Sequence, residues 1–473
     1  MSQSATTNRI TYFLSLLKQS IRGDQQDYTT GSIRKAVFML AIPMILEMGM
    51  ESVFALVDLY FVGHLPNGKD AIQAVGLTES VLSLIYSVAM GISMGATAAV
   101  ARRIGEKDRE AAAVAGVQSL VIALVVTIII SVTGFIFAAD MLRIMGAEPQ
   151  TIAQGVNYTR IMFGGSIVII LLFIINGIFR GAGDASMAMK SLWLANICNI
   201  ILCPLLIRGI GPFPELGLTG AAVATTIGRG IGVIYQLYHL FLGKSIIRLK
   251  RKYLHANWPI IKSMISIASP ATVQFIIGSC SWIFLARLVA TLGHNDASAG
   301  YQIAIRAVIF FLLPAWGISN AAATLVGQNL GAQQPQRAEH SVIQTAKYNA
   351  IFMLTVSMLF LLGPHWVVSF FTTDPVVKDY AIDALRVISA GYVFYGIGMV
   401  MMNTFNGAGD TWTPTWINLA GFWAFQIPLA YLLAKVFGLG PLGVFISIPA
   451  AEVAMTIAAI VLFRRGKWKL VKI

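Results

Sequence analysis

Three acidic residues inside one long apolar segment are the side chains of this sequence best placed to do chemistry. Glu47, Glu51 and Asp58 are spaced four and seven residues apart. On a helix this spacing places all three within about 40° of one another on one face. A charged group inside a lipid bilayer is costly, so it normally faces a polar cavity and marks the path of an ion. The pattern therefore predicts a cation-coupling site, with Asp58 as its leading candidate.

Amide and hydroxyl side chains in later apolar segments could complete such a site. Asn176, Asn199 and Thr225 lie within or near the middle of these segments. Such groups can coordinate a cation or hydrogen-bond to a carboxyl group, but in membranes they more commonly join helices to one another. From the sequence alone both interpretations stay open. A further alternative is that one or two of the three acids only pair with an arginine such as Arg229.

Long helices must position these residues, and the composition predicts them. Of the residues, 57% are hydrophobic and 12% are charged, whereas an average soluble domain carries about 25% charged residues. A helix of about 20 apolar residues crosses the hydrocarbon core of a bilayer. The sequence therefore predicts an all-α integral membrane protein with twelve transmembrane helices, at 36–62, 71–100, 111–137, 156–179, 187–207, 216–242, 260–291, 298–328, 340–371, 379–405, 413–437 and 440–463.

The chain repeats itself, which predicts two homologous halves of six helices. Gly105 recurs as Gly331, and the Phe-x-Gly-Ala-Gly-Asp motif at 179–184 recurs at 405–410, both 226 residues later. An even number of helices in each half gives a parallel repeat, and such halves hold their substrate between them. The expected organisation is an amphipathic cytoplasmic segment, the N-terminal half, a basic cytoplasmic linker, the C-terminal half and a basic tail, at 1–33, 34–242, 243–259, 260–465 and 466–473.

The net charge of +13 indicates orientation in a membrane rather than binding to nucleic acid. Counting alternate connectors, 24 basic residues fall on the side of both termini and seven on the other side. Cytoplasmic loops carry the excess of Lys and Arg in membrane proteins. The distribution therefore predicts a multi-pass protein of the plasma membrane, a bacterial inner membrane, with both termini in the cytoplasm and no nucleic-acid partner.

The sequence lacks the patterns of an enzyme, of ATP-driven transport and of a metal site. It contains neither a Gly-x4-Gly-Lys-Ser/Thr phosphate-binding loop nor a His-Glu-x-x-His motif. Its three cysteines lie in apolar segments and do not indicate a disulfide framework. We therefore expect no enzyme activity and no cofactor, only a proton or sodium ion as coupling ion. The expected partners are a small-molecule substrate and the lipid bilayer, and the expected state is a monomer.

The motifs of the chain, in their order on the twelve predicted helices, resemble those of the multidrug and toxic compound extrusion (MATE) family. The resemblance covers about residues 34–465. It rests on Val57-Asp58-Leu-Tyr-Phe-Val62-Gly63, Ala74-Val75-Gly76, the paired Phe-x-Gly-Ala-Gly-Asp motifs, Asn199-Ile-Ile-Leu-Cys203-Pro204 and Gly220-Ala-Ala-Val-Ala-Thr225. It implies an alternating-access antiporter that exports small organic, often cationic, compounds in exchange for protons or sodium ions.

The resemblance also implies roles for particular residues. Asp58 matches the coupling acid of the family, and Asn176, Asn199, Cys203 and Thr225 match its cation site. That set would serve sodium if sodium is the coupling ion, although Cys203 stands where the family often has an acid.

Two further positions concern the branch of the family. Gly278 and Tyr395 stand where the NorM-type branch has acids, so the chain resembles the DNA-damage-inducible-type branch more closely. The substrate is not identified by the sequence. The alternative function is a flippase for a lipid-linked precursor, which a cavity dominated by arginine would favour.

Overall fold

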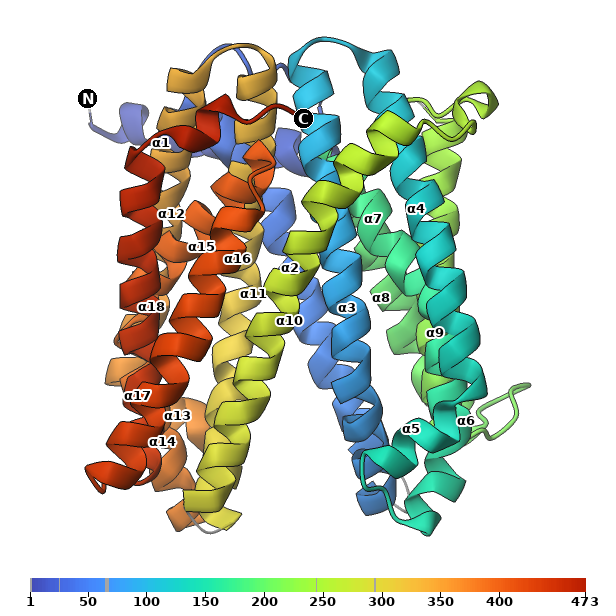
Figure 1. Ribbon diagram of the computed structural model, residues 1–473, viewed down its shortest axis with the longest axis vertical. Helices are drawn as coiled ribbons and strands as arrows, with labels where there is room; N and C mark the ends of the chain where they lie inside the picture. The colour runs from blue at the N-terminus through green and yellow to red at the C-terminus, as the bar shows by residue number, and fades with distance from the viewer. Residues whose placement is uncertain (1, 25, 64–67, 244, 293–294) are drawn as a thin grey trace.

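The structure is a computed structural model that describes residues 2–24, 26–63, 68–243, 245–292 and 295–473. Within these residues the chain is built from α-helices with short π-helical and 3-10 segments (Figure 1). In chain order they are α1 (Ser2–Arg22), α2 (Ile33–Gly63), α3 (Gly68–Gly105), α4 (Arg109–Ile136), α5 (Ala138–Ile144), α6 (Pro149–Gly164), α7 (Ser166–Ala182), α8 (Ala185–Arg208), α9 (Leu218–Phe241), η1 (Arg251–Tyr253), α10 (Trp258–Leu292), α11 (Asn295–Gly331), α12 (Pro335–Leu362), α13 (Pro364–Ser369), α14 (Pro375–Ser389), α15 (Tyr392–Ala408), α16 (Trp412–Asn418), η2 (Leu419–Gln426), α17 (Ile427–Tyr431), η3 (Leu432–Val436), α18 (Pro441–Arg464) and η4 (Lys467–Leu470).

The predicted all-helical membrane fold is confirmed. Among the described residues, 11 helices are long and apolar enough to cross a membrane, and the pair α14 and α15, bent by 54°, gives the twelfth if it forms one span. One predicted end is wrong, because the segment 340–371 is interrupted: α12 ends at Leu362 and α13 begins at Pro364. Proline fits the first turn of a helix but breaks a helix interior, so Pro364 starts a new helix instead of extending α12.

The spanning helices form two bundles. Helices α2–α9 make the N bundle and helices α10–α18 make the C bundle (Figure 1). The bundles lie close together at the end that carries both chain termini and diverge toward the opposite end. Helix α2 packs against α11, and α3 packs against both α10 and α11, so these helices make the main contacts between the bundles.

Small residues allow the bundles to approach at the end near the termini. A Cβ atom at Gly105, the last residue of α3, would overlap the carbonyl oxygen of Gln328 in α11. A Cβ atom at its repeat partner Gly331 would overlap the carbonyl oxygen of Arg102 in α3. The two equivalent glycines therefore make reciprocal backbone contacts between the halves, which explains why this position carries glycine in both repeats.

The N-terminal segment lies at this same end. Helix α1 lies at this end (Figure 1), where it packs against α2 and α8, and the Ser20 hydroxyl donates to the carbonyl of Met39 at 2.9 Å. Tyr12, Phe13 and Leu14 of α1 are exposed, in agreement with an amphipathic helix, and its membrane contact stays a prediction. Residues 1 and 25 of this segment and Lys244 of the predicted basic linker lie outside the described residues.

The contact at Gly105 generates a test of the fold. The variant Gly105→Val should lower the thermal midpoint of unfolding in detergent, because overpacking a tight contact costs about 1–3 kcal/mol. Gly76→Val is the matched control, since a Cβ atom at Gly76 meets open space. Equal midpoints for the two variants would contradict the reciprocal contact.

Candidate ion-coupling site

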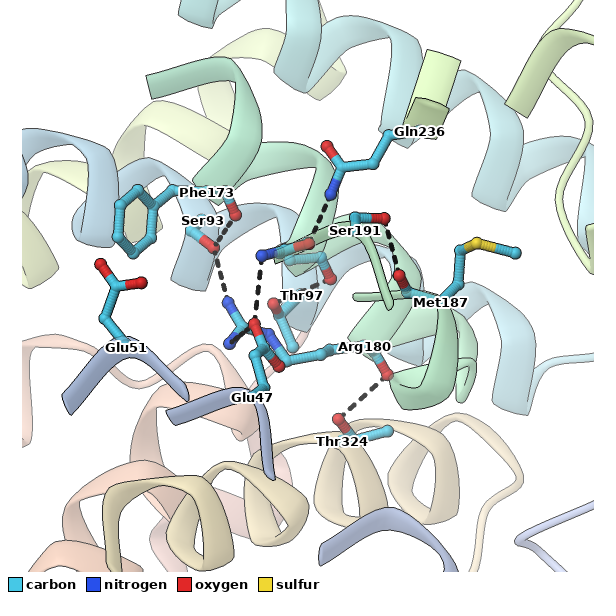
Figure 2. Close-up of polar contacts among 12 residues, drawn as sticks. Glu47, Glu51, Ser93, Thr97, Phe173, Arg180, Met187, Ser191, Gln236 and Thr324 are labelled. Carbon is cyan, nitrogen blue, oxygen red and sulfur yellow. Dashed lines mark hydrogen bonds and ion pairs between the residues drawn. The ribbon is translucent and has the colours of Figure 1, made fainter. Parts of the chain in front are cut away.

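The acidic stripe of α2, which consists of Glu47, Glu51 and Asp58, faces the other helices of the N bundle. Glu47 is 1% exposed and lies against α7, where Asn176 and Arg180 reach it. The Asn176 amide donates to Glu47 Oε1 at 3.1 Å, and Arg180 Nη1 lies 3.5 Å from the same oxygen (Figure 2). Gln236 of α9 donates to Asn176 Oδ1, and Arg180 also donates to the Ser93 hydroxyl of α3. A charged network thus joins α2 to three helices of the N bundle.

Glu51 occupies the next level of the stripe and holds a second arginine. Arg229 of α9 donates to both carboxylate oxygens, with Nη2 at 2.5 Å from Oε1 and Nη1 at 3.3 Å from Oε2. Asn196 of α8 donates to Oε2 at 3.0 Å. The Arg229 guanidinium also lies 5.1 Å from the centre of the Phe54 ring, which favours a cation. Pairing with Arg229, left open by the sequence, is therefore what the structure shows for Glu51.

Asp58 has a different environment from the other two acids. Its contact among the described residues is the Cys203 thiol of α8, with Sγ 3.9 Å from Oδ1. A thiol is a weak hydrogen-bond donor. No ion pair to Asp58 is present among the described residues, so this carboxylate has no arginine of its own, although the charge of Arg229, which pairs with Glu51, acts on it.

The other candidate residues lie near the stripe but do not gather around Asp58. Asn176 contacts Glu47, and the Asn199 amide donates to the Thr225 hydroxyl at 2.9 Å. Within the described residues neither Asn199 nor Thr225 is hydrogen-bonded to Asp58. Asn199 is 3% exposed and Thr225 is 6% exposed, so their bond joins α8 to α9 in the interior of the bundle.

Arg180 was missed by the sequence analysis, which counted it among the cytoplasmic residues. The predicted helix ended at 179, whereas α7 continues to Ala182 and Arg180 is 7% exposed inside the bundle. The signal that could have identified it is the Phe-Arg-Gly-Ala-Gly-Asp motif itself, since Gly183 adopts a left-handed conformation that ends the helix after Arg180.

Charge balance separates Asp58 from the rest of the stripe. Three carboxylates of α2 face two buried guanidinium groups, and each guanidinium pairs with one glutamate. A buried ion pair becomes strongly unfavourable when one partner loses its charge. Glu47 and Glu51 are therefore fixed in structural pairs, whereas Asp58 can change its charge without leaving a buried arginine uncompensated.

Comparison with known proteins identifies the family. The model of the MatE family matches residues 43–205 and again residues 270–432. This chain belongs to the MatE family. MatE proteins are transporters and not enzymes, so the chain is a membrane transporter that exports compounds.

Individual relatives of this MatE chain have different descriptions. "Probable multidrug resistance protein NorM" of Thermotoga maritima is 28% identical over 439 residues, covering 92% of this chain and 93% of that protein. The "FAD transporter" of Shewanella oneidensis is 27% identical, covering 93% and 97%. A solved MOP superfamily transporter from Pyrococcus furiosus, described as having a binding pocket of reverse polarity, is 26% identical with a TM-score of 0.88, covering 94% and 98%.

The Glu47–Arg180 pair generates a stability prediction. Arg180→Met should destabilise the protein in detergent by about 3–5 kcal/mol, because it leaves a buried carboxylate without its cation. The double variant Glu47→Gln, Arg180→Met should be more stable than Arg180→Met alone, because it removes both charges. Thermal unfolding measures both, and a double variant less stable than the single one would contradict the pairing.

Proposed function

We propose that this transporter exchanges organic cations for protons, and that Asp58 is the residue that carries the proton. The observation that supports this assignment is the charge balance of the α2 stripe: Glu47 and Glu51 each hold a buried arginine, while Asp58 is held by a thiol. A coupling acid must gain and lose its charge during transport. Of the three acids, Asp58 is the one that can do so at the lowest cost to the bundle.

Proton binding at Asp58 would couple to movement through the cost of burying charge. An ionised carboxylate favours conformations in which water reaches it, whereas a protonated one can be enclosed among apolar side chains. Occupancy of Asp58 by a proton therefore shifts the balance between outward- and inward-open conformations. The Glu47 and Glu51 pairs keep α2 attached to α7 and α9, so the stripe moves with the N bundle as a unit.

The contacts favour a proton over a sodium ion. A hard cation binds oxygen ligands in preference to sulfur, and Asp58 has a sulfur neighbour at 3.9 Å. Asn176, Asn199 and Thr225 are the further members of the proposed sodium set, and each is engaged with a partner other than Asp58. For these reasons we propose Asp58 as a proton site and assign the three polar residues to helix packing.

The charges also favour cationic substrates over anionic ones. Arg180 and Arg229, the buried arginines beside the α2 stripe, are neutralised by acids. The third buried arginine of the N bundle, Arg102 at the end of α3, donates to the backbone carbonyls of Ala408 and Val471. Arg287 and Arg306 of the C bundle are exposed. This argues against a lipid flippase with an arginine-rich cavity, and against a dinucleotide such as the FAD that names one relative. An excess of carboxylate over arginine attracts positive charge.

The placement in the membrane and the branch belong to the same proposal. We propose a monomer in a bacterial plasma membrane with both termini cytoplasmic, on the basis of the basic connectors, and we keep the predicted domain boundaries. We also propose the DNA-damage-inducible-type branch, because Gly278 and Tyr395 occupy positions that are acidic in the NorM-type branch. One of the relatives named above carries the name NorM, so the branch stays a prediction.

Dye transport in vesicles tests the coupling residue. Proteoliposomes containing the full chain should move ethidium when a pH gradient is imposed, and Asp58→Asn should abolish this movement because it removes the exchangeable proton. Glu148→Gln, the same chemical change at an exposed residue, should transport like the unmodified protein. Gradient-driven transport that survives in Asp58→Asn would refute the assignment. Transport driven by a sodium gradient alone would show that the coupling ion is sodium and not the proton.

The orientation generates a separate prediction. A fluorescent protein fused after Ile473 should fluoresce in bacterial cells, because it folds in the cytoplasm. Alkaline phosphatase fused at the same place should be inactive, because it folds in the periplasm. The reverse result would place the C-terminus outside the cell and contradict the assignment from the basic connectors.

A further inference from the structure

The C bundle contains a cavity that the α2 stripe does not reach. Its volume is about 330 Å³, and helices α10, α11, α15 and α18 supply most of its walls. Aromatic and sulfur-containing side chains form much of this wall, among them Phe275, Trp282, Trp316 and Met399. Cavities of drug-sized ligands start at about 300 Å³ and have mostly apolar walls with a few polar groups. The size and the wall therefore suit a small aromatic molecule.

One acid in this wall is unlike the acids of the N bundle. Glu452 of α18 lines the cavity and is 7% exposed. The structure gives its side chain neither a hydrogen bond nor an ion pair with any described residue, although α18 packs against α14 and α15. Buried charged groups in proteins are normally paired or hydrogen-bonded. The Glu452 carboxyl therefore lacks the partner that a positively charged ligand in the cavity would supply.

Three amide oxygens in the same wall are also without partners. Gln274 Oε1, Asn403 Oδ1 and Asn406 Oδ1 are buried, accept no hydrogen bond and belong to residues that line the cavity. Buried polar atoms are normally hydrogen-bonded, so each such atom needs an explanation. The oxygens of Gln274 and Asn406 are enclosed by the protein, so a ligand with N–H groups reaches them when these amide side chains turn toward it. The Glu452 carboxyl is the acceptor that lines the cavity without such a movement.

The orientation of one amide is fixed by its neighbours. The Ser319 hydroxyl donates its proton to the Trp316 carbonyl at 2.8 Å, so it can only accept from Asn403. The Asn403 amide nitrogen accordingly donates to Ser319 Oγ at 2.6 Å. The oxygen of Asn403 is thus a buried acceptor without a partner among the described residues, and its fixed orientation keeps it away from a ligand in the cavity.

We propose that this cavity binds an organic cation that carries N–H groups, with Glu452 as its charge partner. The amide side chains of Gln274 and Asn406 turn so that their oxygens accept the N–H groups, and the aromatic wall stacks on the cation. This inference rests on the proposed export of organic cations and adds the place where the cation binds. Proton binding and substrate binding would then occur at different places, the proton on α2 of the N bundle and the substrate in the C bundle.

The cavity is placed where it can communicate with the N bundle. Met94 of α3 lines it from the other bundle, and Met94 and Trp316 also line a small cavity of about 30 Å³ next to Arg180. Met94 and Trp316 therefore separate the cavity from the small one beside Arg180. A site at this interface can be exposed to one side or the other when the bundles rock.

Direct binding of ethidium to the purified full chain tests the site without requiring transport. Ethidium is a planar cation with two amino groups, and its binding can be followed by quenching of tryptophan fluorescence, since Trp282 and Trp316 line the cavity. Glu452→Gln should weaken binding at least about tenfold, a loss of 1.4 kcal/mol. Glu452→Asp keeps the charge and should bind within about threefold of the unmodified protein, and Glu148→Gln should bind unchanged.

Further variants keep the test decisive if Glu452→Gln fails to fold. Asn406→Ala removes one acceptor and should weaken ethidium binding about threefold or more, the effect of one lost hydrogen bond. Tetraphenylphosphonium is a cation without N–H groups, so its binding should be weaker and should not change in Asn406→Ala. Ethidium binding that is unchanged in both Glu452→Gln and Asn406→Ala would overturn the proposal. A saturable fluorescence response to sodium chloride alone, lost in Glu452→Gln, would also overturn it.

Asp58→Asn separates this proposal from the proposed function. That variant should lose gradient-driven transport but still bind ethidium in a Glu452-dependent way. Glu452-dependent binding without any gradient-driven transport would support the site and refute the antiporter. Gradient-driven transport together with ethidium binding that does not depend on Glu452 would refute the proposed binding site and leave the antiporter proposal standing.

Discussion

The structure depends on how charge is accommodated inside an apolar protein. Removing a carboxylate or a guanidinium group from water costs more than most single packing interactions return, so each buried charge needs a partner. Helix α2 carries three carboxylates into the N bundle, and two arginines, one on α7 and one on α9, form ion pairs with two of them. The unequal numbers leave Asp58 as the acid without an arginine, and the proposed coupling follows from that inequality.

The same constraint links the two bundles. Reciprocal contacts at Gly105 and Gly331 bring the halves together at the end that carries the termini (Figure 1). The Arg180 network of the N bundle approaches the cavity of the C bundle, with Met94 and Trp316 between them. Movement at the interface of the bundles would therefore alter the surroundings of both the α2 stripe and Glu452, as the proposed exchange of a proton for an organic cation requires.

Hydropathy and spacing predicted much of the fold and one part of the site. The span boundaries follow from apolar length, because the bilayer imposes that length on every helix. Errors arose where a span boundary depends on a local feature, as at Pro364 and at Arg180. The acidic stripe could be found because its residues share one helix face, and the spacing along one helix determines which residues share it.

The partners of the stripe could not be predicted, because they depend on how neighbouring helices are rotated and at what depth they meet. Asn176 and Asn199 were both plausible neighbours of Asp58, yet the first lies beside Glu47 and the second beside Thr225. Glu452 was missed for a related reason: it is a single acid in an apolar helix, and its significance arises from amides on α10 and α15 that only the folded chain brings together.

The most direct test of the central claim is the release of protons when substrate binds. Ethidium would be added to the detergent-purified protein in weakly buffered solution, and the change in pH would be followed with an indicator dye. If a protonated Asp58 and a bound cation oppose each other, the linkage between them requires release of up to about one proton for each dye bound. The account predicts this release in the unmodified protein and in Glu148→Gln, and a smaller release in Asp58→Asn, in which only the Glu452 carboxyl can give up a proton to the bound cation. The same release from Asp58→Asn would contradict it.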